Sequence, residues 1–478
     1  MTSISLLLAR LHKLPPPKAF ILPRNRNHIF VPPNSSHFND QSPINQTQSK
    51  YNPEDPGERI ADLLSNSTHL LLLRQIHAHV IRTHFLESSN LPLHWNNLIR
   101  SYTRLNSPIR AFQVYLAMSR CGLFPDHYTL PITLKAVGQI YSLKTSQQLH
   151  GVAIRHGLDG NEFVESGLIR VYLKGGEFGD AYKVFDGSSE RKLGSWNAVI
   201  AGLSQGGRPK DAVHMFLRMR RSGFMADGVT IVSVVSACGS LGDLKLAVQL
   251  HKIVFQVKHK RNEDTLMLNS LIDMYGKCGR MDLAHEVFSK MHERDVSSWT
   301  SMIVGYAMHG HATEAMDCFR AMIDSNVMPN HVTFVGVLSA CVHGGMVDEG
   351  KHCFQLMKNV YGIEPQMQHY GCMADLLGRA GSLEDARNLV EGMPMKPNVV
   401  IWGCLLGASE RHSDVNMGEW VAKHFLELEP WNDGIYVVLS NIYANRDMWK
   451  QVEKIREIMK QRRLAKLHGY SRVTSIID

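Results

Sequence analysis

One tryptophan-containing segment recurs along the chain at a nearly constant interval. The sequence SWNAVIAGLSQGG at 195–207 has close counterparts at 94–106 (HWNNLIRSYTRLN) and 298–310 (SWTSMIVGYAMHG), and a more distant one at 401–413 (IWGCLLGASERHS). The tryptophans of these segments, Trp95, Trp196, Trp299 and Trp402, are separated by 101, 103 and 103 residues. Such a fixed interval indicates an array of repeated structural units rather than one globular enzyme domain.

Each interval contains shorter units that share an apolar pattern. A glycine is followed five residues later by alanine, then by an apolar residue four positions on and often by methionine three positions after that, as in Gly207, Ala212, Phe216 and Met219. Positions i, i+4 and i+7 lie on one face of an α-helix, and glycine or asparagine suits the left-handed turn that ends a helix. Each unit is therefore predicted to be a helix–turn–helix hairpin. One hairpin cannot bury both of its faces, so the hairpins should stack into a solenoid.

Aligning the units on these marks divides the chain into three alternating kinds of repeat. The first kind comprises 92–126, 193–227 and 296–330. The second kind comprises 127–161, 228–264 and 331–366, with a partial copy at 57–91. The third, shorter kind comprises 162–192, 265–295 and 367–398. The array of about ten repeats is thus predicted to occupy 57–398.

Composition narrows the classes of partner and site. The net charge of +8 and the pI of about 9.0 favour an anionic partner, with nucleic acid first. The eight cysteines include no C-x-x-C pair, which argues against a zinc site or a disulfide framework, and we interpret them as small buried thiols. No apolar run approaches the roughly 18 residues of a membrane span, so no membrane association is expected.

The N-terminal segment differs from the rest of the chain. Residues 1–39 contain no acidic residue, carry several arginines and lysines, and include the amphipathic stretch ISLLLARLHKL at 4–14. This pattern predicts an organelle transit peptide over 1–39. Its leucine content favours the mitochondrion, with the chloroplast as the alternative. The segment 40–56, rich in Pro, Asn, Gln and Ser, is predicted to be a disordered connector.

At this point the sequence resembles a known family, the plant pentatricopeptide repeat proteins of the PLS class. LIDMYGKCG at 271–279 and CMADLLGRAG at 372–381 resemble characteristic short repeats of that class. The resemblance implies an all-α fold, a right-handed superhelical solenoid. The segment 399–466 resembles the E domain that follows the last repeat, with YVVLSNIYANRDMWKQVEKIREIMKQRRLAK at 436–466 as its second half. The segment 467–478 resembles a degenerate form of the tail that follows this domain, without the family's DYW deaminase domain.

The resemblance further implies binding of single-stranded organellar RNA, one nucleotide per repeat, read by the fifth and last residues of each repeat. Three pairs resemble the uridine-preferring combination and one resembles the adenine-preferring one: Asn96/Asp126, Asn197/Asp227 and Asn269/Asp295, and then Thr300/Asn330. The expected RNA pattern is U-N-N-U-N-U-A. Other repeats depart from the code. Two of them carry the fifth/last pairs Ser166/Lys192 and Gly371/Asn398, and the repeats of the second kind carry Pro131, Val232 and Val335 at the fifth position. The alternative reading is structural, since Asn and Asp are also common helix caps.

Two further residue types recur with the repeats and have competing interpretations. The tryptophans could stack on bases, but they directly precede the fifth position, and we interpret them as packing between helices. His77, His150 and His251 occupy one register of the second helices. Spacing that follows the repeat indicates a structural role for these histidines and not metal binding.

We expect no catalytic, cofactor-binding or metal-ligating residues, and therefore a non-enzyme. A cytidine deaminase needs H-x-E and C-x-x-C motifs, and neither occurs in the 478 residues. The expected function is a sequence-specific adaptor for cytidine-to-uridine editing, whose 399–466 segment recruits a deaminase or editing cofactor protein in trans. The alternatives are a factor for RNA splicing, stability or translation, or a protein-binding helical scaffold like tetratricopeptide arrays.

Overall fold

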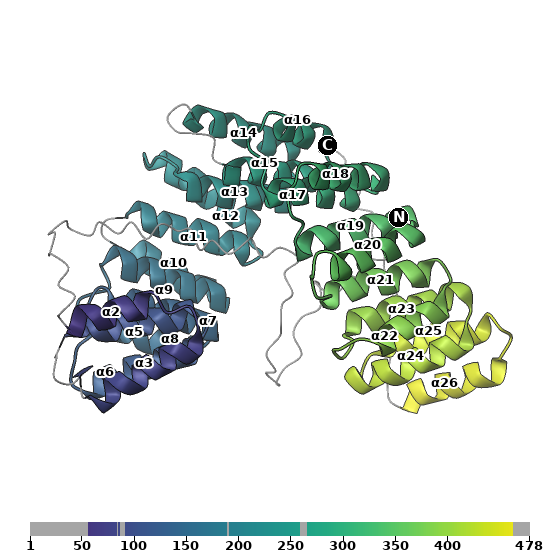
Figure 1. Cartoon of the computed structure of the whole chain (residues 1–478), viewed down its shortest axis with the longest axis horizontal. Coiled ribbons are helices and arrows are strands. Elements are labelled where there is room, and N and C mark those ends of the chain that lie inside the picture. The colour runs from purple at the N-terminus through teal and green to yellow at the C-terminus, as the bar shows by residue number, and fades with distance from the viewer. Residues whose placement is uncertain (1–55, 84, 87–90, 189–190, 259–264, 462–478) are drawn as a thin grey trace. The chain divides into compact units, whose positions relative to one another are not determined.

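The computed structural model describes residues 56–83, 85–86, 91–188, 191–258 and 265–461. The predicted transit peptide, the predicted tail at 467–478 and all but the last residue of the predicted connector lie outside these described residues. Within them, every helix or strand element is an α-helix (Figure 1). The predicted all-α class is confirmed.

The helices alternate between two roles, a first and a second helix in each hairpin. The first helices are α2 (Pro56–Ser65), α5 (Pro92–Arg104), α7 (Thr129–Ile140), α9 (Glu162–Gly175), α11 (Leu193–Gln205), α13 (Gly228–Leu241), α15 (Thr265–Lys277), α17 (Val296–Met308), α19 (His331–Gly344), α21 (Met367–Arg379), α23 (Val399–His412) and α25 (Asp433–Ala444). The second helices are α3 (Leu70–Arg82), α6 (Pro108–Arg120), α8 (Leu143–Arg155), α10 (Phe178–Gly187), α12 (Pro209–Arg221), α14 (Leu244–Lys258), α16 (Met281–Ser289), α18 (Ala312–Asp324), α20 (Val347–Asn359), α22 (Leu383–Glu391), α24 (Val415–Leu428) and α26 (Trp449–Gln461).

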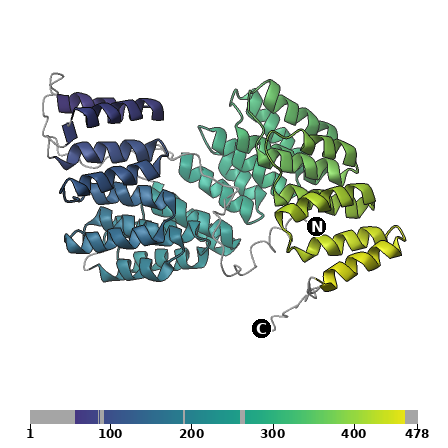
Figure 2. The ribbon, with the colours of Figure 1, turned by 90° about the horizontal axis from the view of Figure 1, so that it is seen from below.

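Successive hairpins stack in a single direction along the chain. Each first helix packs against the first helix of the next hairpin, as α9 does against α11 and α17 against α19 (Figures 1 and 2). Each first helix also packs against its own second helix, which in turn contacts the following first helix. This nearest-neighbour pattern is that of a solenoid, as the sequence predicted. The first helices therefore form one continuous layer.

The predicted turn and core positions lie where the pattern required. Gly207 has φ +74°, a left-handed conformation that glycine adopts without a Cβ penalty. The equivalent turn residues also have positive φ: Asn106, Gly176, Gly279, Gly310 and Gly381. Ala212 is fully buried, as are its counterparts Ala111, Ala284, Ala315 and Ala386. The small residue lets the two helices of a hairpin approach each other.

The recurrent tryptophans belong to the core between hairpins. Trp196 is fully buried, and its ring meets Phe185 of the preceding hairpin edge-on at a centroid distance of 4.7 Å. Trp299 meets Phe288 in the same way at 4.8 Å, and Trp95 is also buried. These contacts support the packing interpretation of the three tryptophans.

Thiol burial differs from the expectation at one position. Cys238, Cys341 and Cys353 are buried, and four others are half-buried. Cys121 is exposed, so its interpretation as a buried thiol was wrong. It is the C-cap residue that follows the last residue of α6. In the described part of the chain, the helices are too short or too polar for a transmembrane span.

Candidate nucleic-acid interface

The fifth and last residues of a repeat come together because of the layer of first helices. The fifth residue lies in the first turn or two of a first helix, and the last residue lies at the start of the next first helix. Because these two helices pack side by side, the two side chains can meet across the helix boundary. The structure therefore places each predicted pair at a junction between adjacent repeats.

Asn197 and Asp227 form the most completely bonded pair. Asn197 Nδ2 donates to Asp227 Oδ2 at 2.8 Å. Asp227 is the N-cap of α13, where its Oδ1 accepts the Thr230 amide at 2.8 Å and the Thr230 hydroxyl at 2.8 Å. The same hydroxyl lies 2.5 Å from Asn197 Oδ1. Asp227 thus caps the start of α13 and also holds the side-chain amide of Asn197 in the preceding repeat.

The two other Asn–Asp pairs repeat this arrangement. Asn269 Nδ2 donates to Asp295 Oδ1 at 3.0 Å, and Asn96 Nδ2 donates to Asp126 Oδ1 at 3.4 Å. Burial alone would raise the pKa of Asp126, but hydrogen bonds from the Thr129 amide and hydroxyl, the Tyr128 amide and Asn96 outweigh it, and the pKa is lowered. The carboxylate of this pair is therefore held in its charged form.

The fourth predicted pair does not meet directly. The hydroxyl oxygen of Thr300 lies 2.7 Å from the hydroxyl oxygen of Thr333. That hydroxyl in turn donates to Oδ1 of Asn330, the N-cap of α19, at 3.0 Å. A threonine three residues into the next repeat thus connects Thr300 with Asn330.

This connecting hydroxyl was missed in the sequence interpretation. Each paired Asp or Asn is followed three residues later by Thr or Ser, in Thr129, Thr230, Ser298 and Thr333. All four are fully buried and bond the preceding carboxylate or amide. The pattern [DN]-x-x-[ST] was visible in the sequence and could have identified them as a capping box.

The repeats that depart from the code lack such a pair. Ser166 donates instead to the backbone carbonyl of Glu162 within α9. Lys192 precedes α11 without capping it, whereas Asn398 caps α23 by accepting the Ile401 amide at 3.1 Å. Gly371 has no side chain to contribute. Pro131, Val232 and Val335 lie half-buried on their helices.

The recurrent histidines form a second repeated contact, away from the predicted pairs. Nδ1 of His77, His150 and His251 lies 2.9, 3.0 and 2.7 Å from the hydroxyl of Tyr102, Tyr172 and Tyr275. Burial lowers the pKa of His77 and His150, which favours the neutral ring. Among the described residues, no group of three or more His, Cys, Asp or Glu is arranged to hold a metal ion.

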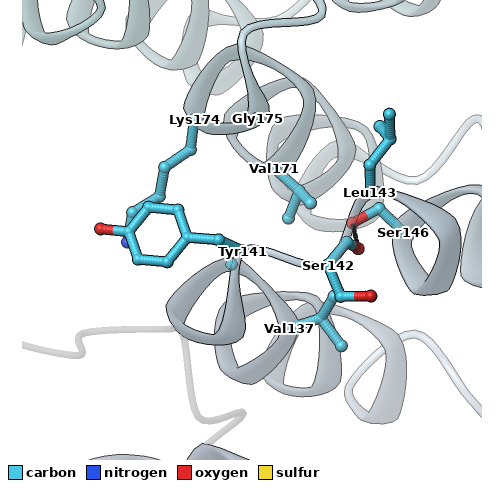
Figure 3. Close-up of a pocket in the computed structure, with 9 residues that line it drawn as sticks. Val137, Tyr141, Ser142, Leu143, Ser146, Val171, Lys174 and Gly175 are labelled. Atoms are coloured by element: carbon cyan, nitrogen blue, oxygen red, sulfur yellow. Dashed lines mark hydrogen bonds between the residues drawn. The ribbon is translucent and has the colours of Figure 1, made fainter. Parts of the chain in front are cut away.

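A small cavity at the junction of α7, α8 and α9 has no capacity for a ligand. Its volume is about 10 Å³, room for about one water molecule. Figure 3 shows its lining, with the Lys174 ammonium lying over the Tyr141 ring at 4.7 Å and the Ser146 hydroxyl bonded to the Ser142 carbonyl. This cavity is therefore too small to hold a ligand larger than a water molecule.

Comparisons with known proteins identify the repeats. The model of the PPR repeat matches residues 93–123, 194–224, 266–296 and 332–360, that of the PPR repeat family matches 294–343, and that of the E motif matches 412–474. The chain is 53% identical over 448 residues to a mitochondrial pentatricopeptide repeat-containing protein of Arabidopsis thaliana, covering 94% of this chain and 96% of the relative. It is 40% identical to a chloroplastic/mitochondrial one from the same plant, covering 79% of this chain but only 61% of that relative.

A solved structure has the same fold. The crystal structure of the pentatricopeptide repeat protein PPR10 in complex with an 18-nt psaJ RNA element superposes with a TM-score of 0.56 at 15% sequence identity. The match covers 84% of this chain and 64% of that chain.

Proposed function

Because the chain belongs to the pentatricopeptide repeat family, we propose that it is a sequence-specific single-stranded RNA-binding adaptor of a plant organelle. The E motif after the repeats is consistent with the E subgroup of the PLS class. The observation that carries the proposal is the recurrence of one polar pair, Asn–Asp, at three repeat junctions. The fold shared with an RNA-bound relative supports it.

The chemistry of the pair suits recognition of one base. Each of the three amide nitrogens donates one hydrogen bond to the neighbouring Asp, and a primary amide carries two N–H groups. Within the described part of the chain, the second N–H of Asn197 has no protein acceptor, and it is the group proposed to bond the pairing edge of a uridine. The Asp227 carboxylate orients the amide. Thr300 and Asn330 take the corresponding places for adenine.

The test of base reading is a binding measurement with a short RNA containing U-N-N-U-N-U-A. Replacing the U that faces Asn197 by A should weaken binding by about fivefold, because a net hydrogen bond contributes about 1 kcal/mol. Asn197→Ala should abolish that preference, whereas the control Asn441→Ala, in the exposed part of α25, should keep it. If exchange of U and A at all four positions changes nothing, the proposed reading is wrong.

The finer proposal is that the bound RNA is edited from cytidine to uridine by a deaminase supplied in trans. The 399–466 segment, which overlaps the matched E motif, is the proposed surface for that deaminase or an editing cofactor protein. The protein itself then acts as an adaptor and not as an enzyme. The names of the two Arabidopsis relatives favour the mitochondrion, with the chloroplast as the alternative.

Sequencing of mitochondrial and plastid transcripts from a plant lacking this protein tests the finer proposal. We expect loss of editing at one or a few cytidines that follow the U-N-N-U-N-U-A pattern. Intact editing with an unspliced or missing transcript would instead assign a role in splicing, stability or translation. Purified protein that binds no RNA at moderate salt but captures a partner protein would favour the scaffold alternative.

A further inference from the structure

The first helices expose a narrow stripe beside the predicted base-reading positions. In α5 the solvent-facing residues include Leu93, Arg100 and Arg104, and in α9 they include Phe163 and Arg170. Spacings of seven and four residues keep such a stripe on one face of a helix. The ninth residue of a repeat lies one turn beyond the fifth, as Arg100 does beyond Asn96, and on the same side.

The ninth position is basic in the first three full repeats and in none of the next six. Arg100, Lys135 and Arg170 occupy it in α5, α7 and α9, and all three are exposed. The structure gives none of the three an ion pair with another described residue. The equivalent residues of the following repeats are neutral or acidic: Ala201, Ser236, Asp273, Val304, Ser339 and Asp375.

The later acidic residues cancel the nearest positive charges. Asp273 forms an ion pair with Lys277 at 2.6 Å, and Asp375 forms one with Arg379 at 3.0 Å. Within the described residues, the basic side chains of the stripe on α5, α7 and α9 therefore have no ion-pair partner, whereas Asp273 of α15 and Asp375 of α21 are paired. Arg104 does not belong to the basic set, because its guanidinium donates to backbone carbonyls at the end of α2 and to that of Ser67 in the following loop at 2.8 Å.

The spacing of the three cations fits an extended polyanion. The helices α5, α7 and α9 pack side by side (Figure 1), and packed helices lie about 8–10 Å apart. Equivalent positions on three such helices therefore form a row about 20 Å long. A small anion would occupy one member of the row, while a single-stranded phosphodiester backbone can contact all three.

We propose that Arg100, Lys135 and Arg170 form a phosphate-binding row that holds the RNA backbone independently of base sequence. The inference rests on the proposed RNA-binding function and divides the array by task. Two of the three repeats that carry the row have Pro131 and Ser166 at the fifth position and lack a base-reading pair. The repeats from 193 to 330, which carry three of the four predicted pairs, lack the row. Backbone binding thus predominates in the segment 92–192 and base reading in 193–330.

The test removes the charges of the row and measures the salt dependence of RNA binding. The full-length triple variant R100Q/K135Q/R170Q is compared with R120Q/K144Q/R155Q, which removes three exposed cations from the second helices α6 and α8. Dissociation constants are measured by fluorescence anisotropy from about 50 to 200 mM salt. The probes are a U-N-N-U-N-U-A RNA and a scrambled RNA of equal length.

Each phosphate contact with a single strand contributes about 0.7 to the slope of log K against log salt concentration. Loss of three contacts should therefore make the slope less steep by about 2 and weaken binding by about 100-fold at 0.1 M salt. The loss should be equal for both RNAs, and the control variant should match the wild type. Restoring charge with R100K/R170K should preserve the slope, since an ammonium also binds phosphate.

Each contrary outcome is informative about a different claim. A wild-type slope in the row variant, or an equal change in the control variant, overturns the phosphate row and leaves the RNA-binding function standing. Failure of the wild-type protein to bind either RNA overturns both. If the triple variant unfolds in a thermal melt, K135Q alone decides, with an expected slope change of about 0.7.

Discussion

Replacement of Trp196 by alanine tests whether the repeated tryptophans hold the solenoid together or contact ligand. Trp196 is fully buried, packs edge-on against Phe185 and lies 6.0 Å from the Phe224 ring. A buried aromatic of this size removes about 200 Å² from water, which corresponds to about 5 kcal/mol at 25 cal/mol per Å². Since alanine retains part of this burial, we expect W196A to destabilise the protein by about 3–5 kcal/mol.

The loss should be local, because solenoid stability is approximately a sum over repeats and their interfaces. Hydrogen exchange followed by mass spectrometry should show faster exchange by roughly two to four powers of ten in α10 to α13. Amides in α21 to α23 should be unaffected. W196F should cost less, because it keeps a ring against Phe185 and removes the buried indole N–H, which has no acceptor among the described residues.

A solvent-exposed tryptophan provides the control. Trp431 is 73% exposed in the loop before α25, so W431A should change the free energy of unfolding by less than about 0.5 kcal/mol. The packing argument is refuted if W196A leaves hydrogen exchange in α10 to α13 at the wild-type rate. Weaker RNA binding by such a stable variant would show that the indole stacks on a base instead.

Two further predictions concern the packing of the first helices and their response to pH. A Cβ at Gly378 would lie 2.8 Å from the Cβ of Ala408, which cannot move to another rotamer. G378A should therefore lower the free energy of unfolding, measured by urea denaturation, by about 1–3 kcal/mol. The control G407A, where a Cβ would lie in open space, should not lower it. Burial lowers the pKa of His369 below its usual 6.5, so the unfolded chain takes up this proton first, and stability should fall as the pH drops below about 6.5. The urea midpoint should fall less in H369Q than in the wild type between about pH 7.5 and 5.5; equal falls would refute this assignment.

Local features were predictable from the sequence because they depend on residues close together in the chain. The turn at Gly207 and the buried face of Ala212 follow from helical periodicity, and the capping role of Asp227 follows from its place before an apolar helix. Contacts between repeats were harder to predict. That Thr230 reaches Asn197 across 33 residues, while Thr300 meets Asn330 only through a second hydroxyl, depends on how adjacent helices are offset.

The same limit applies to the row on the first helices. Arg100, Lys135 and Arg170 can be read from the sequence, but only the folded chain shows that none of them forms an ion pair with another described residue. Arg104 shows the difference, because it lies one turn further along α5 and yet bonds the end of α2 and the loop that follows it. Sequence alone could not separate a cation available to a ligand from one used by the fold.

Asp227 both caps α13 and accepts a hydrogen bond from Asn197, and this dual role restricts how the ligand preference of such a protein can change. A residue at this place must first begin a helix, so exchanges among Asp, Asn, Ser and Thr change its chemistry with little effect on folding, whereas an apolar replacement costs about 1 kcal/mol. Lys192 stands at the equivalent place before α11, where the helix starts without a side-chain cap. Over evolutionary time, new ligand preferences are therefore most accessible within the few side chains that also initiate helices.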